Sequence, residues 1–128
     1  MRKLLSIYIL MALVACSSAP DAGEVAAKAA KQYYSYLIEG NYDTFVDGYY
    51  RQDSIPGSYR EQLITNVKMY IGQQKEERRG IKEVRVVNAK ADTANHAANV
   101  FLVFVYGDST NEEIVVPMVE SKGVWYLR

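Results

Sequence analysis

Tyrosine is the one residue type in excess in this 128-residue chain that could do specific chemistry, and it occurs eleven times. A phenol combines a flat apolar face with a hydrogen-bonding hydroxyl, so clustered tyrosines suit the binding of sugars, sterols or peptides. We expect such a binding site to be formed by Tyr33, Tyr49, Tyr50, Tyr70, Gln74 and Trp125. The alternative is that these aromatic side chains simply fill a tapered core.

The other reactive side chains are few and poorly placed for catalysis. His96, the only histidine, lies at an expected hairpin turn, and Cys16 is the only cysteine. The sequence therefore predicts neither a zinc site nor a serine–histidine site, and it contains no calcium-type carboxylate loop or glycine-rich phosphate loop. We expect no metal, no cofactor and no enzymatic activity.

Composition and charge narrow the class of protein further. Hydrophobic residues make up 49% and charged residues 23% of the chain, which is typical of a single globular domain of this length. Fifteen basic and fifteen acidic side chains give a formal net charge of zero. Nucleic-acid binding is not expected, because it requires a concentrated positive surface.

The first fifteen residues are typical of a bacterial lipoprotein signal peptide. Arg2 and Lys3 precede an apolar run over residues 4–14 that is shorter than the roughly 20 residues of a membrane-spanning helix. The sequence Leu13-Val14-Ala15-Cys16 resembles the lipobox, in which the chain is cut before a cysteine that is then acylated. The alternative is an unpaired cysteine within an ordinary secretory signal.

This signal predicts the location of the mature protein. Residues 16–20 would form an acylated cysteine and a short tether, leaving a domain over residues 21–128 without internal disulfides. A serine after the cysteine resembles lipoproteins that are passed to the outer membrane. We therefore expect a cell-envelope protein anchored through Cys16 at the periplasmic face of the outer membrane, or at the outer face of the cytoplasmic membrane in a single-membrane source.

The N-terminal part of the domain has the periodicity of three helices. Asp21 and Glu24 form a capping-box pattern that predicts a helix over residues 22–39, ended by Gly40, with a short helix following Asn41. Ser58 and Glu61 repeat that pattern at the start of a helix that ends at Gly80. The residues expected on the inner faces of the long helices are Ala26, Ala30, Tyr33, Leu37, Tyr59, Leu63, Val67, Tyr70, Ile71 and Gln74.

From Ile81 onward the pattern changes to that of extended strands. Val84 and Val86 alternate with Glu83 and Arg85, and further strands are expected over residues 97–106, 112–120 and 124–127. The short connections require antiparallel neighbours, so the fold class is α+β. Because residues 101–105 are apolar on both faces, one apolar face of the sheet must point away from the helices.

The order of these elements resembles the nuclear-transport-factor-2-like (NTF2-like), or cystatin-like, cone. In that fold three N-terminal helices pack on the concave face of a curved four-stranded antiparallel sheet. The chain also resembles uncharacterised bacterial lipoproteins of this fold, through the helix end over residues 29–42 and the Gly123-Val124-Trp125 ending. Fold follows from this resemblance more directly than function does.

The resemblance implies several functions. Ketosteroid isomerases of this superfamily pair a tyrosine with a buried aspartate, but Asp43, Asp47 and Asp53 fall near the short second helix, so no catalytic residue is assigned.

We expect a non-enzymatic lipoprotein that binds a small or extended ligand, or a segment of a partner, in or beside the cone. The alternative is an interaction or assembly module that uses the convex sheet face, through which cones of this superfamily commonly form homodimers. Arg85 and Lys82, or the helix-to-sheet loops, could instead cover that face.

Overall fold

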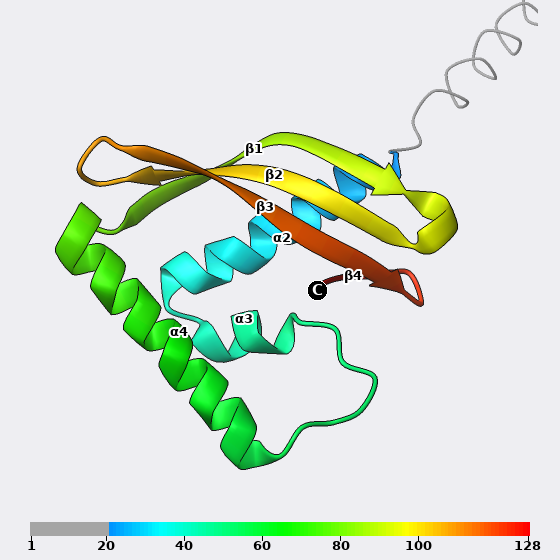
Figure 1. The fold of residues 1–128 in the computed structure, drawn as a ribbon, viewed down its shortest axis with the longest axis horizontal. Helices are drawn as coiled ribbons and strands as arrows, with labels where there is room; N and C mark the ends of the chain where they lie inside the picture. The colour runs from blue at the N-terminus through cyan, green and yellow to red at the C-terminus, as the bar shows by residue number, and fades with distance from the viewer. Residues whose placement is uncertain (1–20) are drawn as a thin grey trace, which may run out of the picture.

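The computed structural model describes residues 21–128, which form three helices followed by a four-stranded antiparallel sheet (Figure 1). Cys16 and the expected signal peptide lie outside the described residues. The strands follow one another in the order β1-β2-β3-β4, which confirms the expected α+β meander. The elements are α2 (Ala22–Glu39), α3 (Tyr42–Asp47), α4 (Gly57–Arg78), β1 (Ile81–Asp92), the 3-10 turn η1 (Thr93–Asn95), β2 (Ala97–Tyr106), β3 (Asn111–Ser121) and β4 (Val124–Leu127).

Helix α2 forms as the sequence predicts and lies across the inner face of the sheet. The backbone N–H of Glu24 donates to Asp21 Oδ1 at 2.8 Å, and Gly40 ends the helix with a left-handed φ of 89°. Ala26 and Ala30 are fully buried in the core. Alanine side chains are small enough to bring the helix backbone close to the strands, so α2 is the helix that anchors the helical layer to the sheet.

The start of α4 differs from the expected position. The helix begins at Gly57, because the carbonyl of Pro56 already accepts the N–H of Arg60 at 3.1 Å and closes the first turn. Ser58 therefore lies inside this turn, and the predicted capping box with Glu61 is not formed. Tyr59, predicted on the inner face, is 52% exposed, since α4 packs mainly against α3 and the start of β1.

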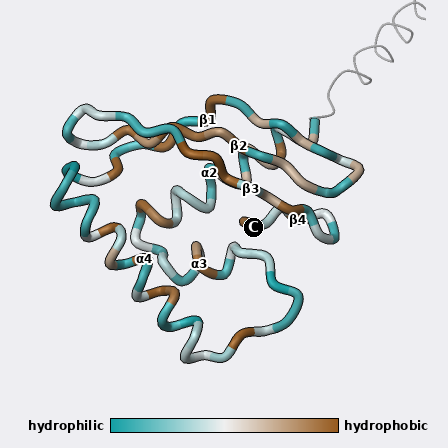
Figure 2. Tube along the Cα trace, in the orientation of Figure 1, coloured by the Kyte–Doolittle hydropathy of each residue, from teal (hydrophilic) through white to brown (hydrophobic). Residues whose placement is uncertain are grey.

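The structure shows which face of β2 points toward the helices. Val100, Leu102, Phe104 and Tyr106 are buried beneath the helices, whereas the intervening residues Phe101, Val103 and Val105 are only half-buried on the convex face. Hydrophobic residues run along both central strands (Figure 2). The expectation of an apolar outer face is therefore correct for the described residues.

Strand β1 departs from the simple alternation that the sequence predicts. Val84 is buried, but Val86, which should share its face, is 41% exposed. Val86 pairs with Leu102 as Val84 pairs with Phe104, so it keeps the inner face, and its exposure reflects its place on the edge strand. The alternation is broken only after Val86, where the register with β2 shifts before Asn88.

The outer side of β4 is covered by the segment that follows α3. The N–H of Tyr50 donates to the carbonyl of Leu127 at 2.7 Å, and the N–H of Leu127 donates to the carbonyl of Gly48 at 2.8 Å. The main core cluster extends from Ala26 to Leu127, so the segment starting at Asp21 contains a complete core and we expect it to fold on its own. None of the helices in residues 21–128 has the length and apolarity to cross a membrane.

Candidate functional site

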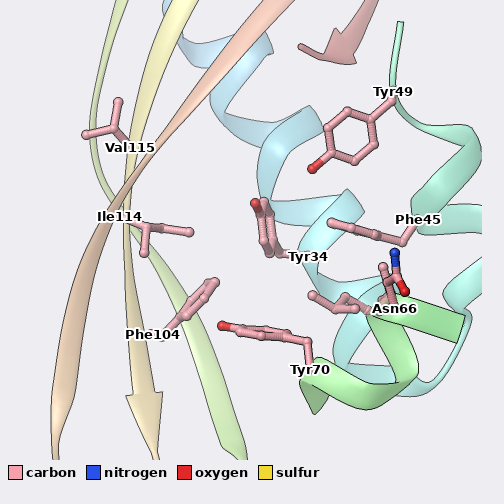
Figure 3. Close-up of a pocket in the computed structure, with 10 residues that line it drawn as sticks. Tyr34, Phe45, Tyr49, Asn66, Tyr70, Phe104, Ile114 and Val115 are labelled. Atoms are coloured by element: carbon pink, nitrogen blue, oxygen red, sulfur yellow. The ribbon is translucent and has the colours of Figure 1, made fainter. Parts of the chain in front are cut away.

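A pocket of about 380 Å³ opens between the helices and the middle of the sheet (Figure 3). This volume lies within the range of about 300–1,000 Å³ that is usual for small-molecule sites. We call it the aromatic pocket, and its lining residues come from α2, α3, the turn after α3, α4, β2 and β3: Tyr34, Leu37, Phe45, Tyr49, Asn66, Val67, Tyr70, Phe104, Ile114 and Val115. Ile114 points into the pocket, whereas the side chain of Val115 points away from it, to the convex face of the sheet (Figure 3). The pocket lies where α4 packs beside α3 instead of closely against β2 and β3.

Tyr34 lies at the centre of the aromatic pocket. Its ring centroid is 5.2 Å from that of Phe45 and 5.4 Å from that of Phe104, so it connects the helices to the sheet. Burial, and secondarily the nearby phenols of Tyr49 and Tyr70, raise the pKa of Tyr34 well above its ordinary value. The Tyr34 hydroxyl therefore stays protonated at physiological pH and is able to donate a hydrogen bond to a ligand.

Two further phenols approach the aromatic pocket from opposite sides. Tyr49 lies edge-on to Phe45 with centroids 5.8 Å apart, and Tyr70 extends from α4 toward Phe104 (Figure 3). Burial raises the pKa of both hydroxyls, although the charge of Arg51 partly offsets this effect at Tyr49. The wall is thus largely apolar, with three phenols and the amide N–H groups of Asn66 available for hydrogen bonding, since Asn66 Oδ1 already accepts from Gln62 Nε2 at 2.9 Å.

A polar cluster behind the aromatic pocket fixes the C-terminal end of α4. Tyr106 donates its hydroxyl proton to Glu112 Oε1 at 3.0 Å, and the Arg78 guanidinium lies 4.6 Å from the Tyr106 ring centroid and 3.5 Å from Glu112. Burial first, and then the hydrogen bond to Glu112, raise the pKa of Tyr106. These contacts hold α4, and with it Tyr70, at a defined distance from β2 and β3.

The structure brings together only part of the predicted site. Tyr49 and Tyr70 line the aromatic pocket, whereas Tyr33, Tyr50, Gln74 and Trp125 are absent from its described lining. Tyr33 instead donates to the backbone carbonyl of Trp125 at 2.7 Å, and Trp125 is buried in the core. Tyr50 lies beside Tyr126, and the buried side-chain oxygen of Gln74 has no hydrogen-bond partner among the described residues.

Four residues that line the pocket were not predicted from the sequence: Tyr34, Phe104, Ile114 and Asn66. Tyr34 is rotated by about 100° from Tyr33 around α2, so it faces α3 and α4 while Tyr33 faces β4. Phe104 and Ile114 were predicted to lie on strands. Knowing which face of those strands points inward would have placed both residues beneath the helices.

The aspartates considered for isomerase-like chemistry all lie at the surface. Asp43, Asp47 and Asp53 are exposed, and Arg60 forms a two-point hydrogen-bonded ion pair with Asp47 at 2.9 and 2.8 Å. This pair lowers the pKa of Asp47. Within residues 21–128 no carboxylate lines the aromatic pocket, and no group of three or more His, Cys, Asp or Glu side chains could hold a metal ion.

Comparison with solved structures identifies the fold. A candidate NTF2-like transpeptidase from Campylobacter jejuni superimposes with a TM-score of 0.61 at 12% identity, covering 77% of this chain and 92% of that protein. A SEC-C motif containing protein from Rhodopseudomonas palustris gives a TM-score of 0.52 at 13% identity, covering 77% of this chain and 71% of that protein. No family model and no curated protein matches the sequence. The chain has the NTF2-like fold, as the sequence pattern indicates, and at these identities the likeness concerns the fold alone.

Proposed function

We propose that this protein is a membrane-anchored envelope lipoprotein that binds a small or extended apolar ligand in the aromatic pocket, without catalysing a reaction. The observation that carries the proposal is a pocket of about 380 Å³ whose wall is aromatic and aliphatic except for three phenols and one amide. Such a wall provides apolar contact area together with a few oriented hydrogen bonds, which is the usual composition of a ligand site. Among residues 21–128, no Asp or Glu that could act as a catalytic carboxylate lines the aromatic pocket.

The proposed anchor is the acylated thiol of Cys16, at the periplasmic face of the outer membrane. The support is the Leu-Val-Ala-Cys sequence after a short basic and apolar leader, and the serine that follows the cysteine. Several acyl chains hold a protein at a membrane more firmly than one chain does, because each buried methylene contributes about 0.8 kcal/mol. An anchored binding domain would take its ligand from the membrane surface or the space beside it.

Binding in the aromatic pocket is tested with N-phenyl-1-naphthylamine, an uncharged dye whose fluorescence rises in apolar surroundings. The domain from Asp21 to Arg128 is expected to bind this dye. In Ile114→Trp the indole would occupy space into which Ile114 points, and the dissociation constant is expected to rise about tenfold or more.

Val103→Trp is the matched control, because it adds the same indole to β2 on the opposite face of the sheet. This variant is expected to bind the dye like the natural domain. Circular dichroism of both variants checks that they remain folded. A natural domain that does not bind the dye, or an Ile114→Trp variant that binds it unchanged, would contradict the proposed function.

A second candidate function is supported by the convex face of the sheet. Val115 is 55% exposed there and pairs across β2 and β3 with Phe101, which is only half-buried. Long side chains cover this face only in part: Lys90 Nζ lies over the Phe101 ring, 6.0 Å from its centroid, while Arg85 is paired with Glu83 and Val115 stays exposed. Contiguous apolar surface of this kind is typical of an interface, so we propose that this face forms a homodimer or binds a partner protein.

Sedimentation of the domain from micromolar to higher concentrations tests the homodimer. We expect the average mass to rise with concentration, and Val115→Glu to keep the domain monomeric because two charges would be buried without partners. Glu113→Gln, next to Val115 on β3 but at a charged position, serves as the control and should dimerise like the natural domain. A natural domain that remains monomeric at every concentration would eliminate self-association and leave only a foreign partner.

A further inference from the structure

A second pocket adjoins the aromatic pocket along the contact between α3 and α4. We call it the inter-helix pocket; it has a volume of about 330 Å³ and is lined by Phe45, Val46, Tyr49, Tyr50, Arg51, Tyr59, Leu63, Asn66 and Val67. It shares Phe45, Tyr49, Asn66 and Val67 with the aromatic pocket, so only these side chains stand between the two spaces. We call the two adjoining pockets, with the shared side chains between them, the apolar path; it extends from the turn after α3 to the inner face of β2 and β3.

Charge is concentrated at one end of this path. Arg51 is the only charged residue among those that line either pocket in the described part of the chain. Its Nη1 group donates to the backbone carbonyl of Val46 at 3.0 Å, which fixes the guanidinium and leaves its other N–H donors free. Arg51 forms no ion pair within 4.0 Å among the described residues, although its charge helps to lower the pKa of Asp47, which is held by a two-point pair with Arg60.

The Arg51 cation also acts on the groups at the junction of the two pockets. Burial raises the pKa of the Tyr49 phenol, and the charge of Arg51 offsets part of that rise. The Tyr49 hydroxyl and the Asn66 amide lie on the shared wall, so hydrogen-bonding groups stand close to the charged end. Beyond them, toward Phe104 and Ile114, the path is lined by apolar side chains and by the Tyr34 and Tyr70 rings.

We propose that the ligand is an amphiphile whose anionic head group binds Arg51 and whose acyl tail passes between α3 and α4 into the aromatic pocket. This proposal rests on the proposed function and specifies the ligand class. A guanidinium forms strong two-point hydrogen bonds with carboxylate and phosphate, and an apolar path beside one cation complements a chain that ends in one negative charge. The shared chemistry is an acyl chain with a carboxylate or phosphate head, supplied by a free fatty acid or by a phospholipid.

The test displaces N-phenyl-1-naphthylamine from the domain with three ten-carbon probes: decanoate, decyl phosphate and 1-decanol. At least one of the two anionic probes is expected to displace the dye at about one tenth of the concentration that the uncharged alcohol requires. Preference for decanoate points to a free fatty acid and preference for decyl phosphate to a phospholipid. In Arg51→Gln this preference for an anion is expected to disappear while displacement by 1-decanol remains unchanged.

Two further variants separate the local contact from general electrostatics. Arg51→Lys keeps the positive charge and should retain part of the preference, and Arg85→Gln removes one charge from the far side of the sheet and should leave it intact. If the alcohol competes as well as the anions, or if Arg51→Gln keeps the preference, the head-group assignment is overturned while dye binding still supports the proposed function. If the dye itself does not bind, and isothermal titration detects no binding of decanoate or decyl phosphate, both proposals fail.

Discussion

Replacing Leu102 by alanine is expected to lower the free energy of unfolding by about 2–5 kcal/mol. Leu102 is fully buried at the centre of β2, directly beneath the helical layer, so truncation removes apolar contacts and leaves a cavity in a close-packed region. Urea unfolding followed by circular dichroism should show a lower midpoint with an unchanged slope, because the surface exposed on unfolding remains the same.

The neighbouring residue Val103 provides the control for this prediction. It lies on the same strand but points to the convex face and is only half-buried. Val103→Ala is expected to cost less than about 1 kcal/mol, since little buried surface is lost. Equal costs for the two substitutions would show that the convex face is as well buried as the core and would contradict the assignment of the two faces.

Gly107→Ala is expected to lower the free energy of unfolding by about 1–3 kcal/mol, because there is no room for a side chain at this position. A Cβ atom there would lie 2.5 Å from the backbone oxygen and 2.9 Å from the Cβ of Arg79. The β2–β3 hairpin would have to move away from the end of α4, which would weaken the 2.9 Å hydrogen bond from the Gly107 N–H to the Gly80 carbonyl. Urea unfolding measures the loss.

Gly72→Ala is the matched control in the same protein. Gly72 lies on the exposed side of α4, and a Cβ atom there would have no neighbour within 4 Å. Alanine is favoured over glycine in a helix by about 0.5–1 kcal/mol, so this variant should be slightly more stable than the natural domain. A Gly107→Ala variant as stable as Gly72→Ala would show that the hairpin adapts without cost.

The strands and α2 could be predicted because their signals are local. The cap formed by Asp21, the turn at Gly40 and the apolar run within residues 97–106, bounded by turn residues, fix these elements through neighbouring residues alone. The start of α4 could not be predicted in the same way. Pro56 closes its first turn through a backbone carbonyl, and this interaction competes with the side-chain cap that Ser58 offers.

The candidate site was less predictable than the fold because it depends on the spacing between elements. Tyr33 and Tyr34 are equally aromatic and adjacent, and their roles diverge only because β4 lies on one side of α2 and α3 lies on the other. The aromatic pocket lies where α4 packs against α3 and stays away from β2 and β3, and this distance between elements has no counterpart in the hydrophobic pattern. The composition therefore indicates an aromatic site, and only the packing of the helices locates it.

The pairing of residues 48–50 with β4 has a consequence for the behaviour of many copies at high concentration. An unpaired edge strand exposes a row of N–H and C=O groups that can recruit a strand from another molecule and begin aggregation. Here Gly48 and Tyr50 bond to Leu127 from the side opposite β3, so the short terminal strand offers fewer free groups to a neighbour. At the opposite edge, β1 carries a bulge and the charged residues Lys82, Glu83 and Arg85, which discourage strand addition. Both edges of the sheet are thus protected against intermolecular β-pairing, and this protection matters most for molecules crowded together on one surface.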